Sequence, residues 1–421
     1  MSKLFKVFPF AYVLFKFYLI TINTSAQKLL VFLVLILYIS LNYPVVFKKT
    51  DRYRFNSCVL MWVTIAAIAL LVPVVHGTGD FSYARKLLTN TNELLSWTAF
   101  IIFVKKEAEN GNELEVLTDR FGMIVSMYVF FSVICMFAHG FRAFWKTVVF
   151  FSEKELFELQ YEKYIGRFGW DGFAGFNATF MCSFGVLLCL ACLNRKLHAR
   201  ESPIKFGVIL SYMVVFLIGN VLYGRTGLIV SSLMILLLLI QVCIVNKKIQ
   251  YLFLALLLGL FAIVAIVILK DAIPALTALY EWAFEPIINY LSGKGFSATS
   301  LDSLKRMYVM PTSSTVLFGD GYYTDPVTGS YYRNTDVGVL RLTYMWGIIP
   351  TILAYLFTLK AFQRTIINDG MMRYLVFIML VLFEAKGEVF RMLLYMFTAI
   401  SLLGVGEKTG RYLGITFRRL R

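Results

Sequence analysis

The sequence predicts an all-α, polytopic integral membrane protein with about 12 transmembrane helices and with one large and one medium loop outside the membrane. Of its 421 residues, 59% are hydrophobic and only 16% are charged, and apolar runs recur along the whole chain. This composition excludes a single soluble core. Because backbone groups in lipid must find their hydrogen bonds within the protein, we expect the apolar runs to be helices.

The candidate crossings follow one another closely. Their approximate ranges are 8–22, 29–47, 55–75, 87–104, 121–139, 172–193, 206–223, 228–245, 251–269, 337–359, 374–383 and 392–404. Asn90, Asn92 and Glu93 interrupt the fourth, and the eleventh is shorter than the ~20 residues that a spanning helix needs. The first run shows no small-residue cleavage site, so we expect an uncleaved helix there.

Basic residues are concentrated in alternate loops, which predicts the orientation. The basic groups lie at 48–54, 195–205, 247–248, 360–373 and 418–421. With all crossings kept, these groups fall on one side, together with both termini, and that side is expected to be the cytoplasm. The net charge of +16 is then an orientation signal and gives no reason to expect a nucleic-acid partner.

The crossings and loops divide the chain into five parts. These are N-terminal helices (1–139), a loop with a short amphipathic helix (140–171), central helices (172–270), a large loop (271–336), and C-terminal helices with a basic tail (337–421). Ser152 and Glu155 have the spacing of a capping box, so we expect the helix of the medium loop to begin at Ser152.

Cysteine and histidine patterns argue against a disulfide framework and a bound metal. The six cysteines all lie in apolar runs, and the CxxC spacing of Cys189 and Cys192 inside a predicted crossing is best explained by packing. The three histidines lie far apart, without the spacing of a metal cage. We therefore expect no metal and no cofactor.

Two smaller elements outside the apolar runs carry candidate binding residues. Arg142 and Arg167 lie among acidic and aromatic residues in the medium loop, although an interfacial helix with a solvated charged face has the same composition. Arg225 is flanked by Gly224 and Gly227 in a short connection between two apolar runs, which places it at the membrane edge. A guanidinium there suits a phosphate group, and the alternative is an arginine that reaches the lipid headgroups.

The large loop mixes carboxylates, basic residues and tyrosines. Its candidate residues are Glu285, Arg306, Gly319, Gly321, Tyr322, Tyr323 and Asp336, followed by Arg341 at the start of the next apolar run. Aromatic faces beside carboxylates and arginines are typical of a sugar-binding groove, but they also occur in an ordinary folded loop. For Asp336 the alternative explanation is an N-cap of the following helix.

Several of these segments resemble the Wzy-type O-antigen polymerases. The resemblance rests on Phe318-Gly-Asp-Gly321, on Thr335-Asp-Val-Gly338 with Arg341 and Gly347 after it, on the region from Phe284 to Tyr308, on Gly224-Arg-Thr-Gly227, on Arg167-Phe-Gly169 before Asn177, and on the late break at Ala385-Lys386. Topology extends it over most of the chain.

The resemblance implies a glycosyltransferase without a metal, at the periplasmic face of a bacterial inner membrane. It would move a growing glycan from undecaprenyl diphosphate to a new lipid-linked repeat unit, in a pathway with a flippase and a chain-length regulator. Arg225 and Arg341 would then stabilise the diphosphate and Asp336 or Glu285 would act as the base. Arg142, Arg167, Arg306, Gly319, Gly321, Tyr322 and Tyr323 would contact substrate.

The sequence departs from the family pattern in one respect and leaves two other functions open. No glycine follows Arg142, Arg167, Arg306 or Arg333 at the Arg-x10-Gly spacing that some members have. O-antigen ligases share the architecture but carry a functional histidine in the large loop, and this loop has none. A flippase or other transporter usually has charges inside its crossings. Here Lys16 is the clearest such charge, and the charged residues from Glu384 to Arg391 are predicted to form a surface turn.

Overall fold

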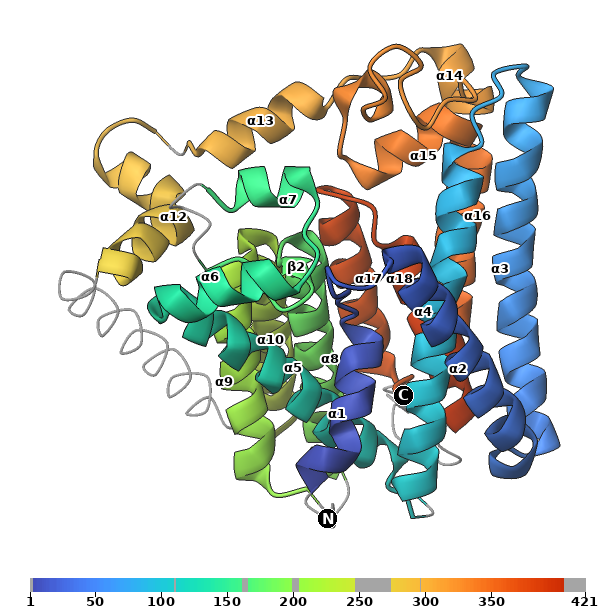
Figure 1. The fold of residues 1–421 in the computed structure, drawn as a ribbon, viewed down its shortest axis with the longest axis vertical. Helices are drawn as coiled ribbons and strands as arrows, with labels where there is room; N and C mark the ends of the chain where they lie inside the picture. The colour runs from blue at the N-terminus through green and yellow to red at the C-terminus, as the bar shows by residue number, and fades with distance from the viewer. Residues whose placement is uncertain are drawn as a thin grey trace, which may run out of the picture.

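The computed structural model describes residues 3–109, 111–160, 166–198, 204–246, 274–295 and 297–404. Long helices run from one end of the molecule to the other (Figure 1). Six helices in this part of the chain are long and apolar enough to cross a membrane: α2 (Thr24–Val46), α3 (Lys49–Val75), α5 (Glu113–Phe137), α8 (Phe176–His198), α9 (Phe206–Tyr223) and α10 (Arg225–Asn246). The all-α class is confirmed, and the apolar helices are those of a membrane protein.

The other helices of the bundle are shorter or less apolar. They are α1 (Lys3–Leu14), α4 (Ser82–Glu107), α15 (Gly338–Trp346), α16 (Ile348–Phe362), α17 (Gly370–Glu384) and α18 (Phe390–Ile400), which continues as η4 (Ser401–Leu403). The predicted run 251–269 lies outside the described residues, as does the basic tail. A total of about twelve crossings therefore stays a prediction.

Two predicted crossings differ from the structure. The first helix ends at Leu14, because the chain after it turns into an extended segment in which Leu19 forms a β-bridge with Val149. The predicted run 337–359 is two helices, α15 and α16, separated at Gly347. Gly347 has a φ of 82°, which favours glycine, and a Cβ there would lie 2.4 Å from the Leu317 carbonyl oxygen.

The polar residues of the fourth predicted crossing do not interrupt its helix. Helix α4 is continuous through Asn90, Asn92 and Glu93. Lys16 Nζ lies 2.9 Å from Glu93 Oε1 and donates to the Asn92 carbonyl at 3.4 Å. The lysine that follows α1 and the acidic residue of α4 thus compensate each other inside the bundle.

Aromatic side chains fill the centre of the bundle between α4, α5 and α8. The Trp97 ring packs edge-on against Phe184 at 5.9 Å, and Phe121 meets the same phenylalanine edge-on at 5.7 Å. All three side chains are buried. This packing fixes α4, which carries part of the candidate site at its first turn.

The medium loop folds into α6 (His139–Val148), α7 (Glu153–Glu158) and a small antiparallel hairpin of β1 (Phe168–Gly169) and β2 (Gly172–Phe173). Ser152 Oγ accepts the Glu155 backbone N–H at 3.3 Å, and the Glu155 carboxylate accepts the Ser152 N–H at 2.8 Å. The predicted capping box and helix start are therefore confirmed.

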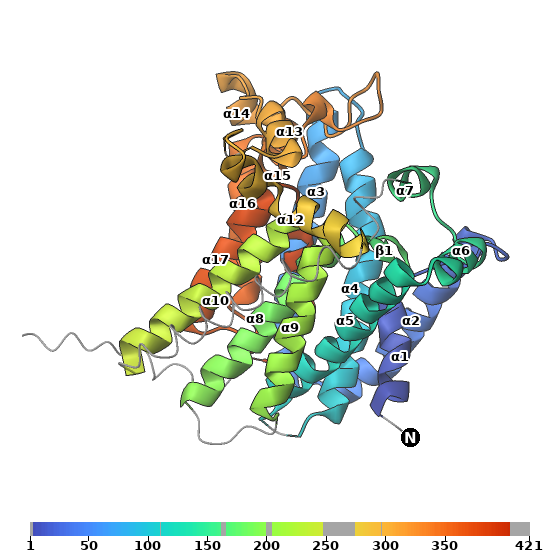
Figure 2. The ribbon, with the colours of Figure 1, turned by 90° about the vertical axis from the view of Figure 1, so that its left-hand side faces the viewer.

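The large loop is helical and lies across one end of the bundle (Figures 1 and 2). It contains α12 (Pro274–Leu291), α13 (Thr299–Met307), α14 (Ser313–Phe318) and the short η3 (Tyr332–Asn334). The connection from α3 to α4 and the break between α17 and α18 lie at this same end, whereas the beginning of α1 lies at the other (Figure 1). Segments far apart in the sequence meet here.

Candidate functional site at the loop-covered end

The connection between α3 and α4 holds the Gly-rich loop that follows α14. Thr78 Oγ1 donates to the Gly321 carbonyl at 2.8 Å. The Asp80 carboxylate accepts the backbone N–H groups of Tyr323 at 2.7 Å and of Thr324 at 2.8 Å. Two adjacent backbone donors on one carboxylate oxygen fix the direction in which the Tyr323 side chain enters the bundle.

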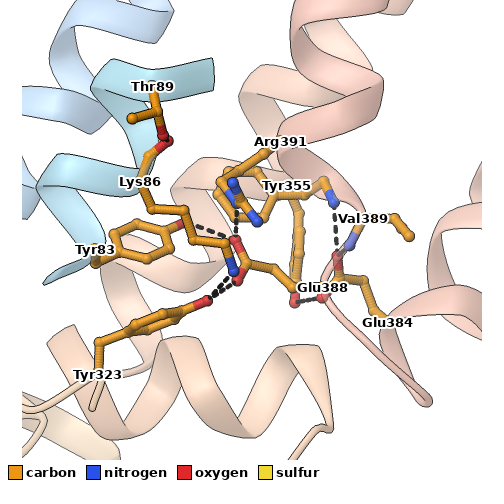
Figure 3. A network of polar contacts seen from close by, with 10 residues as sticks. Tyr83, Lys86, Thr89, Tyr323, Tyr355, Glu384, Glu388, Val389 and Arg391 are labelled. Atoms are coloured by element: carbon orange, nitrogen blue, oxygen red, sulfur yellow. Dashed lines mark hydrogen bonds and ion pairs between the residues drawn. The ribbon is translucent and has the colours of Figure 1, made fainter. Parts of the chain in front are cut away.

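Tyr323 reaches a buried charged network at the start of α18 (Figure 3). Its hydroxyl donates to Glu388 Oε2 at 2.7 Å and accepts from Lys86 Nζ at 2.8 Å, while the Tyr83 hydroxyl donates to Glu388 Oε1 at 2.9 Å. Arg391 also pairs with Glu388 Oε1. Burial alone would raise the pKa of Glu388, but Arg391 and Lys86 outweigh it and contribute to a pKa of about 2.

Glu384 shapes the break that carries Glu388. Its carboxylate accepts the backbone N–H groups of Val389 at 2.6 Å and Phe390 at 2.7 Å, and therefore caps the start of α18. The first residue of α15 packs onto this cap, because a Cβ at Gly338 would lie 2.1 Å from Glu384 Oε2. The start of α15 is thereby held against the break between α17 and α18.

Arg341 of α15 is the most deeply enclosed of the predicted arginines. It is 5% exposed, and its guanidinium carbon lies 3.6 Å from the centre of the Tyr331 ring and 4.3 Å from that of Tyr323. Nε and Nη2 are buried and have no hydrogen-bond partner among the described residues. Lys86 lies near the start of α4, where burial and neighbouring Arg391 lower its pKa to about 7.

These residues form one group, which we call the Tyr323 cluster: Tyr83, Lys86, Tyr323, Tyr331, Arg341, Glu388 and Arg391. It contains three basic side chains and one carboxylate. Because buried cations normally have partners, this composition suits the binding of an anion.

A second group begins at the corner between α9 and α10, where Arg225 is the first residue of α10. The Thr179 hydroxyl donates to the Gly224 carbonyl at 3.0 Å and to Asn220 Oδ1 at 2.7 Å. A Cβ at Gly227 would lie 2.0 Å from Thr179 Oγ1. The corner needs glycine for this close approach, and the buried polar contacts hold Arg225 at the end of the helix pair.

The guanidinium of Arg225 faces α12. Its Nη2 lies 2.9 Å from Glu285 Oε2, and its guanidinium carbon lies 5.0 Å from the centre of the Trp282 ring. Arg167, which precedes β1, lies 4.7 Å from the same ring. Nη1 of Arg225 is buried and without a hydrogen-bond partner among the described residues. Trp282 and Glu285 are three residues apart on α12, so one face of this helix serves both contacts.

Lys386 completes this second group. It lies in the break between α17 and α18, where burial lowers its pKa and the charges of Asp336, Arg225 and Arg167 act on it. We call this group the Trp282 cluster: Arg167, Arg225, Trp282, Glu285 and Lys386. Like the Tyr323 cluster, it contains three basic side chains and one carboxylate.

Asp336 lies within electrostatic reach of both clusters. Its charge raises the pKa of Lys386 in the Trp282 cluster and that of Lys86 in the Tyr323 cluster. Asp336 is half-buried and makes no hydrogen bond or salt bridge with any residue that the structure describes. The N-cap of α15 is Val337, without a side-chain cap. The helix-capping explanation of Asp336 is therefore wrong, and its carboxylate is available.

The structure brings together Asp336, Glu285, Arg225, Arg341, Arg167 and Tyr323 from the predicted site. Arg142 and Arg306 have other neighbours: Arg142 donates to the Leu159 carbonyl at 2.9 Å, and Arg306 is exposed on α13.

The remaining predicted residues have packing contacts. Tyr322 stacks on Tyr332 with ring centres 5.4 Å apart. A Cβ at Gly319 would lie 2.6 Å from the Met345 carbonyl oxygen, and one at Gly321 would lie 2.6 Å from His76 Cβ. Both glycines have positive φ, which a turn tightly packed on α15 and α3 requires. Their contact with substrate stays a prediction.

Sequence reasoning missed Tyr83 and Lys86, and it misplaced Glu388 and Arg391. The predicted surface turn is wrong, because Glu384, Glu388 and Arg391 are 4%, 7% and 5% exposed. The signal that pointed to them was the run of charged residues between two apolar runs. Such a run usually lies on the solvent-exposed surface. Here the opposite charges pair with each other and with two tyrosine hydroxyls inside the protein.

The donor set of the site is basic and aromatic. Among the described residues, no group of three or more His, Cys, Asp and Glu side chains could hold a metal ion. Anion recognition is the chemistry that guanidinium, ammonium and tyrosine hydroxyl groups provide together. Comparison with known protein families, with curated proteins and with solved structures finds no match to this chain.

Proposed function

We propose that this protein is a polysaccharide polymerase, which transfers a growing glycan from undecaprenyl diphosphate to a new lipid-linked repeat unit at the periplasmic face of a bacterial inner membrane. The observation that carries the proposal is the available Asp336 carboxylate, which lies within electrostatic reach of two surplus-cation clusters at one end of a membrane bundle. Diphosphates need the cations, and an acceptor hydroxyl needs a base.

In the proposed reaction, the acceptor sugar hydroxyl attacks the anomeric carbon of the donor glycan. The bond between that carbon and the diphosphate oxygen breaks, the electron pair stays on the diphosphate, and the hydroxyl proton moves to Asp336. Arg341 lies buried between aromatic rings, where it stabilises the developing charge more strongly than it would in water. Arg225 has a further unpaired nitrogen for a diphosphate oxygen.

Between the two predicted bases, the contacts favour Asp336. The Glu285 carboxylate lies 2.9 Å from Arg225 Nη2, so its lone pairs are engaged by a cation. Asp336 has no such partner among the described residues. We therefore assign Asp336 to the proton transfer and Glu285 to holding Arg225 before substrate arrives.

The basic connections support the proposed orientation. The connection between α2 and α3, which contains Lys48, lies at the end of the bundle opposite the large loop (Figure 1). If this basic end faces the cytoplasm, the site faces the periplasm. Lipid-linked repeat units would approach the site from the outer leaflet, and a flippase and a chain-length regulator would act beside the enzyme.

The buried charges between α17 and α18 favour a second candidate function, a flippase for the same lipid-linked oligosaccharide. Charged residues enclosed within a membrane bundle are typical of transporters, and Glu388 and Arg391 are both enclosed. Loss of the two functions would have different effects on the cell, because a flippase is needed before any glycan reaches the cell surface.

Deletion of the gene in its own strain, with the cloned gene restored as the control, separates these functions. The polymerase predicts that the ladder of surface glycan on a gel collapses to core bearing a single repeat unit. Loss of every glycan band would contradict it and would indicate a flippase or a ligase. Lipid-linked repeat units exposed only to the cytoplasm would then identify the flippase.

A further inference from the structure

We propose that the two clusters are separate diphosphate subsites, which hold the donor lipid and the acceptor lipid at the same time with Asp336 between them. This inference rests on the proposed function and assigns a different lipid-linked substrate to each cluster. The Tyr323 cluster takes the donor diphosphate, and the Trp282 cluster takes the acceptor diphosphate.

Charge is the first observation that supports two subsites. In each cluster, three basic side chains occur with one carboxylate, which is Glu388, paired with Arg391, in the Tyr323 cluster and Glu285, paired with Arg225, in the Trp282 cluster. Basic side chains therefore outnumber carboxylates by two in each cluster. A diphosphate that links a lipid to a sugar has one ionised oxygen on each phosphate, and its two negative charges would favour the protonated form of Lys86, whose pKa is about 7 in its absence, and of Lys386.

Unsatisfied donors are the second observation, and each cluster has its own. Nε and Nη2 of Arg341 in one cluster, and Nη1 of Arg225 in the other, are buried without hydrogen-bond partners among the described residues. A buried donor without an acceptor is unfavourable, and a guanidinium offers its donors in the geometry that matches phosphate oxygens. Both clusters are thus incomplete until an anion binds.

The clusters are built from different parts of the chain. The Tyr323 cluster uses α4, α15 and α18, together with the loop that Asp80 holds. The Trp282 cluster uses the corner of α10, the face of α12 and the residue before β1. The strongest charges acting on Lys86 are those of Arg391, Glu388, Arg341 and Asp336. Those acting on Lys386 are the charges of Asp336, Arg225 and Arg167. Asp336 belongs to neither cluster, but its charge acts on the lysine of each.

The chemistry of the two lipids decides which cluster takes which. The donor diphosphate is the leaving group and gains charge in the transition state, which suits the enclosed Arg341. The acceptor diphosphate keeps its bonds and needs only to be bound and released. Arg225 suits this role, because it can exchange Glu285 of α12 for a phosphate oxygen.

Native mass spectrometry of the purified full chain, with undecaprenyl diphosphate as the probe, counts the subsites. We expect two bound diphosphates for the wild type and one each for Arg341→Gln and Arg225→Gln. The control is Lys305→Gln, since Lys305 is exposed on α13 and paired only with Asp302 at 3.7 Å. Its count should stay at two. If an Arg variant fails to fold, Lys86→Gln and Arg167→Gln replace Arg341→Gln and Arg225→Gln.

The outcomes separate this inference from the proposed function. A single bound diphosphate in the wild type, lost in both variants, would overturn the two-subsite inference, while polymerisation of lipid-linked repeat units by the same sample would leave the function standing. If the count is two, kinetics test the assignment: Arg341→Gln should lower kcat, and Arg225→Gln should raise the KM for the acceptor. The reverse pattern would overturn the assignment. Absence of both binding and polymerisation would refute the function itself.

Discussion

The Trp282 cluster and the Tyr323 cluster contain the same numbers of basic and acidic side chains but hold them in different ways. In the first, Arg225 is partly exposed and pairs with a carboxylate from α12, a helix that lies across the bundle. In the second, Arg341 is buried among tyrosine rings, and Glu388 is enclosed by Tyr83, Tyr323 and Arg391.

The difference indicates how each cluster responds to an anion. The salt bridge between Arg225 and Glu285 of the overlying helix can be exchanged for a contact with phosphate, because the Glu285 carboxylate can leave Arg225 as the phosphate arrives. A cation enclosed by aromatic rings and a fixed loop stays where it is, so the anion must come to it. The Trp282 cluster is suited to reversible binding, and the Tyr323 cluster is suited to preorganised stabilisation of charge.

Asp336→Asn should have the largest effect, since the charge of Asp336 acts on both clusters and we propose it as the base. The amide keeps the size of the side chain but cannot take the acceptor proton, so we expect the rate of polymerisation to fall by ~10²–10⁴-fold. Both diphosphates should still bind. The measurement is the initial rate with purified protein and lipid-linked repeat units, together with the count of bound diphosphates.

The matched control for this variant is Asp325→Asn, which changes an exposed carboxylate of the same loop that accepts hydrogen bonds from Val327 and Thr328. Its rate should stay close to that of the wild type. A normal rate for Asp336→Asn would exclude Asp336 as the base.

Part of the Trp282 cluster could be predicted from the sequence, because Arg225 lies in a short segment whose neighbouring residues indicate a corner between two helices. Gly224, Arg225 and Gly227 are adjacent between two apolar runs, so the sequence alone predicts a corner with an arginine at the membrane edge. What it could not show is the partner. Trp282 and Glu285 lie on a helix that reaches the corner only through the fold.

The Tyr323 cluster was largely hidden because its members are distant in the chain. Lys86 and Tyr323 are 237 residues apart, and nothing near Lys86 in the sequence marks it as a binding residue. Glu388 and Arg391 were visible in the sequence as part of a charged group, but charged residues in a short connection are normally exposed to solvent. Their burial depends on mutual pairing, which is a property of the packed structure.

The same limit explains the helices that were predicted incorrectly. The run from Val337 to Leu359 is apolar enough for one helix, yet Gly347 ends α15 because the chain must leave room for the carbonyl of Leu317. Apolar patterns predicted where most of the long helices lie in the described part of the chain. An apolar pattern gives no information about the close tertiary contacts that end a helix.

Asp80→Ala should have an intermediate effect and should act on the Tyr323 cluster alone. It removes the acceptor for the Tyr323 and Thr324 backbone N–H groups, and two partly buried donors left without an acceptor cost about 1–3 kcal/mol. Thermal unfolding of the purified protein measures the loss. The matched control is Asp325→Ala, which also removes the acceptor of two backbone N–H groups in the same loop, but in hydrogen bonds that are exposed to solvent.

The comparison between the clusters becomes sharper if binding is measured on the same samples. Asp80→Ala should weaken donor binding, because Tyr323 no longer fixes Lys86 and the ring beside Arg341. Acceptor binding should stay normal. Equal weakening of both would mean that the two clusters are not independent.

The smallest effect should be the pH dependence that Lys86 confers on the Tyr323 cluster. Burial and Arg391 lower the pKa of Lys86 to about 7, so its ammonium loses the proton as the pH rises through that value. Loss of one unit charge near a diphosphate costs about 1 kcal/mol, which is about a five-fold loss of affinity. We therefore expect the KM for the donor to rise roughly five-fold from slightly acidic to slightly alkaline pH.

Lys86→Arg is the test of that origin, because a guanidinium remains charged over the whole range. Its donor KM should be nearly independent of pH, while the acceptor KM, which depends on Arg167, Arg225 and Lys386 of the Trp282 cluster, should have the same pH profile in both proteins. If Lys86→Arg kept the wild-type pH profile, the titrating group would lie elsewhere. If the acceptor KM followed the same profile as the donor KM, the single titration would reach both clusters, and the charge of Asp336 between them would be the connection to test next.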